Sequence, residues 1–297
     1  MPWGITLGKK TRPVPLGAIL LAVMALVFVS VDIADVWRGL TTSAVRRHYR
    51  GWPSLESNRF HVRFTEKDRE WAEWVAAEAE RAASLVENIL PYTPPAAKPW
   101  LVIAPDQSSI RQAFGWGEGT GALGVYLLET IIILSPQAYE GVDDAERRLF
   151  FARQGPLVHE VTHYVLDVRT GGNYPRWFSE GLAQLLEYQL LGFEWLEADS
   201  SLGQRLYKQD ELDYSFAELP RQALAYRQAL SMVTYLESLR GLDGLNLLLD
   251  KLAKDRPFYL AVEAVYGQDR NALVESWRSW FPAEGRWFLP VAGIEAG

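Results

Sequence analysis

Five residues, His159-Glu160-Val161-Thr162-His163, constrain this 297-residue chain more than any other feature. Residues four apart lie on one face of an α-helix, so a helix here would present both imidazoles on the same side. Two imidazoles placed in this way can ligate one Zn²⁺, and the glutamate between them can act as general base toward a metal-bound water. The chain has only four histidines, and two of them fall in this motif. The sequence therefore predicts a helical zinc site.

The residues around the motif support a helix with two different faces. Pro156 suits the first turn of a helix, and the apolar residues that follow recur at helical spacing. This apolar stripe comprises Leu157, Val161, Tyr164, Val165 and Val168. Because His159 and His163 lie off the stripe, we expect them to face away from the core side, toward a cleft.

A third protein ligand is expected, because a catalytic zinc site typically uses three protein ligands and keeps one position for water. A second predicted helix begins near Pro175, after a connector over 170–174 that contains two glycines. Glu180 falls in the second turn of that helix, and the short connection can bring it against the histidine face. The alternative is a solvated carboxylate, which the helix dipole also favours near a helix N-terminus.

The motif and the downstream segment 177–183, Trp-Phe-Ser-Glu-Gly-Leu-Ala, resemble the gluzincin metalloproteases and, more narrowly, the bacterial peptidase MA-like group. The resemblance spans roughly residues 57–281. It implies that one zinc ion is held by His159, His163 and Glu180. It also implies that Glu160 activates the water that attacks a peptide bond. The number of residues between the motif and the downstream glutamate is slightly smaller here than in thermolysin. This difference shortens the connecting loop but removes no ligand.

The same resemblance implies a residue that stabilises the oxyanion. Tyr226 stands at a predicted helix start, where aminopeptidase-type gluzincins place a tyrosine that donates a hydrogen bond to the tetrahedral oxyanion. Tyr235 is the second candidate. The alternative is that Tyr226, which is one of 13 tyrosines in the chain, contributes only to the packing of a helix.

Supporting residues around the ligands are also implied. Asp167 lies one turn beyond His163, at a place where thermolysin has an aspartate, and metal-bound imidazoles often donate their second N–H to a carboxylate. Alternatively, Asp167 simply ends the helix beside Arg169. Further polar residues fall near the predicted site, namely Ser179, Gln184 and Glu187.

Segment 121–125 reads Gly-Ala-Leu-Gly-Val where the related aminopeptidases carry Gly-Ala-Met-Glu-Asn before an edge strand. In those enzymes the glutamate holds the free amine of the substrate, and Gly124 stands in its place here. The resemblance therefore does not extend to the glutamate on which the exopeptidase specificity of those enzymes depends. We expect an endopeptidase whose strand after Gly124 pairs with an extended peptide by β-augmentation.

The order of the predicted elements indicates the fold class. Strand-like segments dominate the first part of the body, around one long predicted helix at 66–90, and helices dominate after Pro136. The predicted strands are 58–65, 99–104, 125–128 and 130–134, and Asp106 is a candidate N-cap for a short helix. Strands followed by helices predict an α+β fold, with a small N-terminal mixed sheet and then a mostly helical zincin half.

The N-terminus carries a membrane signal. Residues 13–31 contain no charged residue, and about 20 apolar residues span a bilayer. Basic residues precede this run and acidic residues follow it, which places the N-terminus inside the cell and the body outside. We expect four regions: a cytoplasmic N-terminus (1–12), a transmembrane anchor (13–33), a juxtamembrane linker (34–56) and a gluzincin-like metallopeptidase domain (57–297). A cleavable signal peptide and a cytoplasmic body are the competing interpretations.

Composition narrows the remaining possibilities. The absence of cysteine excludes a disulfide scaffold, a cysteine nucleophile and thiolate metal sites. Acidic residues outnumber basic ones by 37 to 30, which argues against nucleic acid as the main partner.

The predicted function is a single-pass, membrane-anchored zinc peptidase of the cell membrane, acting on peptide or protein substrates. The alternative is a non-catalytic zinc-binding scaffold outside the cytoplasm. The sequence leaves the oligomeric state open.

Overall fold

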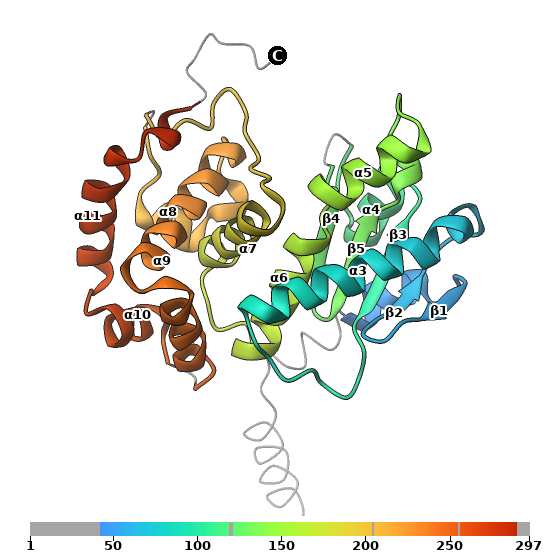
Figure 1. Cartoon of the computed structure of the whole chain (residues 1–297), viewed down its shortest axis with the longest axis horizontal. Helices are drawn as coiled ribbons and strands as arrows, with labels where there is room; N and C mark the ends of the chain where they lie inside the picture. The colour runs from blue at the N-terminus through green and yellow to red at the C-terminus, as the bar shows by residue number, and fades with distance from the viewer. Residues whose placement is uncertain (1–41, 119–120, 204, 255, 290–297) are drawn as a thin grey trace, which may run out of the picture. The chain divides into compact units, whose positions relative to one another are not determined.

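The computed structural model of the chain describes residues 42–118, 121–203, 205–254 and 256–289 (Figure 1). The chain divides into the units 1–45 and 46–297, and the labelled elements belong to the second unit. The predicted anchor at 13–33 lies outside the described residues. Within the described part, none of the helices combines the length and the apolar character that a membrane span needs.

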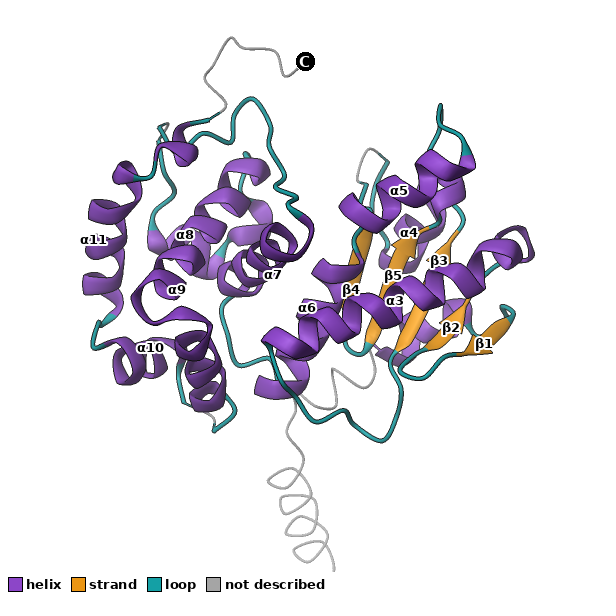
Figure 2. Ribbon diagram, viewed as in Figure 1, coloured by secondary structure: helices purple, strands orange, loops and turns teal. Residues whose placement is uncertain are grey.

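A mixed sheet of five strands forms the first half of the second unit (Figure 2). Its strands are β1 (Ser54–Glu56), β2 (His61–Arg63), β3 (Trp100–Ala104), β4 (Gly124–Leu127) and β5 (Thr130–Leu134). Their spatial order is β1-β2-β3-β5-β4, with β2, β3 and β5 parallel and the two outer strands antiparallel to their neighbours. Among the described residues, β4 is therefore an edge strand.

The central strands are apolar because both faces of the sheet are covered. Residues 131–133 of β5 and 101–103 of β3 are fully buried, and strands buried on both faces read as continuous apolar runs. The long helix α3 (Arg69–Ile89) crosses one face in Figure 1, and α4 (Gln107–Phe114) contacts β3 and β5. The side chain of Asp106 caps α4 by accepting the backbone N–H of Ser109, as predicted.

A tight hairpin joins β4 to β5. Leu128 and Glu129 have φ values of 44° and 60°, and positive φ at both central residues is what a two-residue type I′ turn requires. The right-handed twist that this turn imposes keeps β4 paired with β5 along its full length, from Gly124 opposite Ile133 to Leu127 opposite Thr130.

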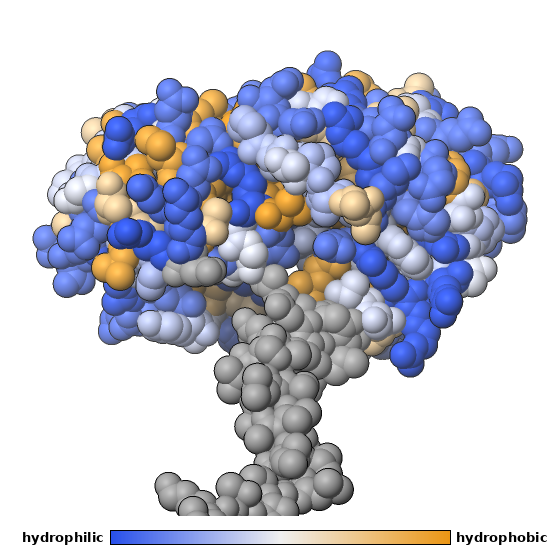
Figure 3. All heavy atoms as spheres, turned by 90° about the horizontal axis from the view of Figure 1, so that it is seen from below, coloured by the Kyte–Doolittle hydropathy of each residue, from blue (hydrophilic) through white to orange (hydrophobic). Residues whose placement is uncertain are grey.

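The second half is helical. Its helices are α5 (Asp144–Gln154), α6 (Leu157–Thr170), α7 (Arg176–Leu191), α8 (Gln209–Tyr214), α9 (Gln222–Leu252), α10 (Phe258–Tyr266) and α11 (Arg270–Trp280). Helix α6 packs against α3, α7 and β4, while α7 packs along α9. The surface seen in Figure 3 is mostly hydrophilic with small apolar groups, as expected when the apolar side chains form an internal core.

One glycine permits the close approach of α7 and α9. A Cβ atom on Gly181 would lie 2.4 Å from the backbone oxygen of Ala229 and 2.7 Å from a methyl group of Val233. A larger residue at position 181 would push the two helices apart. The residue after Glu180 therefore sets how near the start of α9 comes to the predicted site.

The α+β organisation and the mixed sheet are as predicted, and two details differ. The predicted strand at 58–65 contains only three paired residues, because residues 57–60 form the turn between β1 and β2. The predicted single apolar stripe of α6 is too narrow: Val158, Thr162 and Leu166 are buried as well. Neighbours on several sides cover α6, so periodicity alone underestimated its burial.

Candidate metal centre

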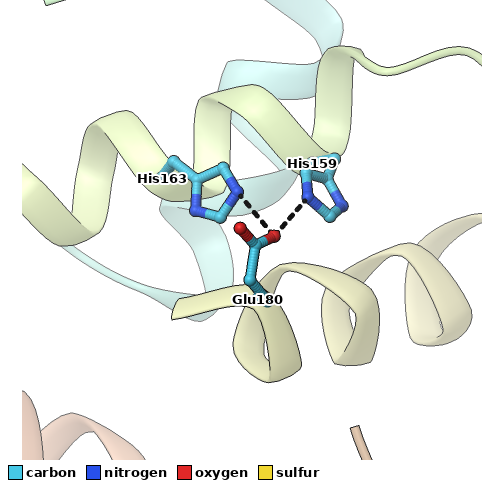
Figure 4. Close-up of side chains that lie close together, drawn as sticks. All are labelled: His159, His163 and Glu180. Carbon is cyan, nitrogen blue, oxygen red and sulfur yellow. Dashed lines mark hydrogen bonds and ion pairs between the residues drawn. The ribbon is translucent and has the colours of Figure 1, made fainter. Parts of the chain in front are cut away.

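Helices α6 and α7 bring the three predicted ligands together (Figure 4). The Nε2 atoms of His159 and His163 lie 3.3 and 3.4 Å from Oε2 of Glu180. Ligand atoms about 2.0–2.1 Å from a tetrahedral zinc ion are about 3.3 Å apart. Both imidazole–carboxylate distances match this value, the three atoms lie within 4.8 Å of one another, and two imidazoles with one carboxylate are a donor set that suits zinc.

Local sequence explains why these side chains meet. His159 and His163 are one helical turn apart on α6, which ends at Gly171 in the left-handed conformation with φ 65°. A short connector then leads to Pro175, and α7 runs back against α6 with Glu180 in its second turn. The side chains of both histidines and of Glu180 are at most 16% exposed, so the ligand group is largely shielded from solvent.

Each imidazole is oriented through its other nitrogen. Nδ1 of His159 lies 2.8 Å from Oε2 of Glu187, and Nδ1 of His163 lies 2.7 Å from Oγ of Ser179. An imidazole whose Nδ1–H donates to a neighbour presents the lone pair of Nε2 to a metal. Glu187 and Ser179, both on α7, thus fix the tautomer and the ring orientation that zinc binding needs.

Asp167 is hydrogen-bonded to two tyrosines. Its two carboxylate oxygens accept hydrogen bonds from the hydroxyls of Tyr126 on β4, at 2.9 Å, and Tyr174 in the connector, at 2.8 Å. Tyr126 in turn stacks on His163, with ring centroids 6.3 Å apart. Asp167 lies on the turn of α6 that faces β4 and the connector, so tyrosines reach it and the imidazoles are supported from α7 instead.

Charge interactions favour the ionised form of the carboxylate ligand. Burial alone would raise the pKa of Glu180, but His163 and His159 outweigh it and hold this pKa well below its usual value. Burial alone would lower the pKa of His159, whereas Glu187 and Glu180 raise it well above the usual value. A buried anion facing two imidazole nitrogens is a donor set suited to a divalent cation.

Glu160 lies beside the ligand group in a closely packed position. It is 5% exposed, and burial raises the pKa of its carboxyl above the usual value despite the opposing influence of His159 and His163. Gly124 of β4 lies directly against it: a Cβ atom on Gly124 would be 2.7 Å from Oε1 of Glu160 and 2.6 Å from Pro156. The absence of a side chain at 124 leaves room for the glutamate.

Tyr226 lies close enough to Glu180 and Glu160 for their charges to act on its hydroxyl, whereas Tyr235 has other partners. Burial raises the pKa of Tyr226 further above its usual value, an effect to which Glu180 and Glu160 add, so the hydroxyl stays protonated. Its ring packs against Trp195 and Phe216. Tyr235 instead accepts a hydrogen bond from Gln268 at 3.0 Å and packs against Trp280.

Two further residues join the site. Arg176, which the sequence reasoning did not single out, donates from Nε to Oε1 of Glu180 at 3.2 Å. Its position one helical turn before Glu180 is the signal that could have found it. Gln184 donates to the backbone oxygen of Tyr226 at 2.8 Å and so ties α7 to α9.

Comparison with known proteins found one family match and similar solved structures. Residues 142–283 match the Peptidase MA superfamily. Native leukotriene A4 hydrolase from Saccharomyces cerevisiae is similar in structure, with 13% identity, a TM-score of 0.46, and coverage of 77% of this chain and 38% of that chain. The yeast enzyme in complex with bestatin gives 13% identity, a TM-score of 0.42, and coverage of 81% and 38%.

This chain thus spans well under half of the length of those solved structures. The comparison with curated proteins gave no match. Segment 142–283, which carries the His-Glu-x-x-His motif and the downstream glutamate, is the part of the chain that is similar to the Peptidase MA superfamily.

Proposed function

We propose that this protein is a zinc-dependent endopeptidase. The observation that carries the proposal is the convergence of two imidazole Nε2 atoms and one carboxylate oxygen beside the buried Glu160. Zinc held by His159, His163 and Glu180 would lower the pKa of water toward neutrality and polarise the carbonyl of the scissile bond. The protein's own groups would do the rest of the chemistry.

Glu160 is the group that moves the proton. Its raised pKa suits a base that takes a proton from the attacking water and then passes it to the leaving amine. Tyr226 supplies a protonated hydroxyl next to Glu180, where a hydrogen bond to the developing oxyanion would stabilise the transition state more than the ground state.

The outer edge of β4, which no strand of the described residues pairs with, supports binding of an extended peptide. The backbone N–H of Leu134 donates to Leu123, so by antiparallel alternation the backbone groups of Gly124 and Tyr126 point away from β5. A substrate strand could pair with these groups beside Glu160. Because Gly124 has no side chain to hold a terminal amine, we propose cleavage within a chain rather than removal of its first residue.

The proposal includes membrane anchorage with the catalytic domain outside the cytoplasm. Its support is the uncharged run at 13–31 and the basic residues before it. Protease added to intact cells should degrade the domain at 57–297. Protection of that domain until the cells are lysed would contradict this part of the proposal.

The central test compares Glu160→Gln with wild type on casein and on a peptide library. Zinc content measured by elemental analysis should be unchanged, while hydrolysis should fall to background because the base is lost. Glu73→Gln, at an exposed position of α3, is the matched control. Mapping the new N-termini should show internal cleavage. Hydrolysis at the wild-type rate in Glu160→Gln would exclude the assigned base, and an inert zinc-loaded wild type would favour a binding module.

A further inference from the structure

Arg176 has no part in the steps described above, yet it contacts the metal-ligand group. It is the first residue of α7, one turn before Glu180. Its Nε donates to Oε1 of Glu180 at 3.2 Å, and 54% of its side chain is exposed while that of Glu180 is only 8% exposed. The guanidinium therefore lies between the buried ligands and solvent.

The two oxygens of Glu180 have different partners. Oε2 faces both imidazole Nε2 atoms, whereas Oε1 accepts from Arg176. A carboxylate held at one oxygen cannot rotate freely about its terminal bond, so the other oxygen stays directed at the metal position. Arg176 thereby selects which oxygen of Glu180 is available as a ligand.

Arg176 and Tyr226 are also neighbours, because both side chains contact the ring of Phe216. Arginine only donates hydrogen bonds, so in a bond between these two groups the tyrosine oxygen would accept, and its own proton would remain available for a different acceptor. Phe216 packs against the Tyr226 ring at 5.3 Å and lies 5.9 Å from the Arg176 guanidinium. These contacts hold the two polar groups in one arrangement.

We infer that Arg176 is a positioning residue that couples the metal ligand Glu180 to the oxyanion donor Tyr226. The planar guanidinium holds Oε2 of Glu180 toward the metal position and at the same time leaves the proton of the Tyr226 hydroxyl available for the oxyanion. The inference has a catalytic half and a metal half. The catalytic half, the effect of Arg176 on Tyr226, rests on the proposed function, whereas the metal half, the effect of Arg176 on Glu180, requires only that the protein binds metal. A lysine ammonium, as a point charge without the fork geometry, should not replace it.

The test measures kcat, KM and zinc affinity for Arg176→Ala and Arg176→Lys, with Arg278→Ala at an exposed site on α11 as control. Removing groups that support metal ligands typically costs about 10–100-fold in metal affinity or activity. We expect kcat on an internally quenched casein peptide to fall about that much in both variants with KM nearly unchanged. Zinc affinity, measured by chelator competition, should fall about tenfold.

A double-mutant comparison isolates the link to Tyr226. In a Tyr226→Phe background the loss of kcat caused by Arg176→Ala should shrink, because the hydroxyl that Arg176 positions is already absent. Added guanidinium ion should partly restore kcat in Arg176→Ala but not in the double variant. An equal loss in both backgrounds, or a loss confined to KM, would overturn the coupling to Tyr226.

The zinc measurement separates failure of the inference from failure of the proposed function. Unchanged zinc affinity in Arg176→Ala would overturn the assigned effect on Glu180, whatever the activity. If wild type binds zinc but cleaves no peptide, the proposed function and the catalytic half of the inference both fail. A tenfold loss of zinc affinity in Arg176→Ala would in that case uphold the metal half alone.

Discussion

At the scale of single residues, the proposed chemistry depends on how tightly Glu160 is confined. The carboxylate is enclosed by Gly124 on the edge strand, by Pro156 in the turn before α6 and by the charges of the ligand group. A base held in this way loses little freedom in the transition state, and small displacements are costly because proton transfer is sensitive to distance.

Replacing Gly124 with alanine should therefore displace Glu160. The added Cβ would lie 2.7 Å from Oε1 and 2.8 Å from Cγ of the glutamate, and a shift of about 1 Å in a catalytic group can cost about 100-fold in rate. We expect kcat to fall by roughly that factor while zinc content stays at the wild-type level. Gly121→Ala is the control, since its Cβ meets only Gln107 at 3.4 Å; equal activity in both variants would contradict the expectation.

The partner of His159 offers a second prediction at this scale. Glu187→Gln removes the charge that holds Nδ1 of His159 while keeping the shape of the side chain. Loss of such a partner costs about 10–100-fold in metal affinity, and a chelator competition assay should show a weakening of that order. Glu73→Gln should leave the affinity unchanged. If Glu187→Gln binds zinc as tightly as Glu73→Gln and the wild type do, then Glu187 does not support His159 as a metal ligand.

At the scale of elements, Asp167 joins three parts of the fold. It lies on α6, and it accepts hydrogen bonds from Tyr126 of β4 and from Tyr174 in the connector to α7. Because Tyr126 also stacks on His163, the carboxylate indirectly sets the distance between the edge strand and the metal ligands. The hydrogen bonds of Asp167 thus hold the helix, the strand and the connector together, and we call this group the polar anchor.

Asp167→Ala should weaken this anchor without weakening zinc binding. Hydrogen bonds to a charged group contribute about 1.5–3 kcal/mol each, and Asp167 accepts two of them, so urea denaturation should show a loss of unfolding free energy of about 3–6 kcal/mol. Zinc affinity should remain near the wild-type value, since Asp167 does not contact an imidazole. A large loss of zinc affinity with little change in stability would instead support the role first expected from the sequence. Asp243→Ala, at an exposed site on α9, is the control.

At the scale of the whole molecule, the site lies where the sheet half and the helical half meet. Helix α6 contacts α3 and β4 on one side and α7 on the other, and α7 is joined to α9 through the close contact at Gly181. A metal bound to side chains of both α6 and α7 would link these elements and stabilise the native state, because it has no preformed site in the unfolded chain.

Removal of metal should therefore lower the melting temperature. A ligand at 100 times its Kd stabilises the native state by about 2.7 kcal/mol, which for a domain of this size corresponds to about 5–10 °C. Scanning calorimetry with and without a chelator should show this shift, and added zinc should reverse it. His163→Ala should melt at the same temperature in both conditions. Equal melting temperatures for wild type would argue against a bound metal.

The sequence by itself determined the parts of this protein that depend on spacing along one element. Spacing of i and i+4 places His159 and His163 on one face of α6, and apolar runs identify β3 and β5. Only the tertiary structure decided which side chains meet between elements. It placed Glu187 and Ser179 against the imidazoles and Arg176 against Glu180, and it placed Tyr235 against Gln268.

The physical reason is that contacts between elements depend on how closely the backbones approach. The approach of α7 to α9 is set by the missing side chain of Gly181, and the approach of β4 to α6 by that of Gly124. Helical and strand periodicity describe the direction of a side chain from its own axis. They contain no information on the distance to a neighbouring axis, and that distance decides which polar groups form the site.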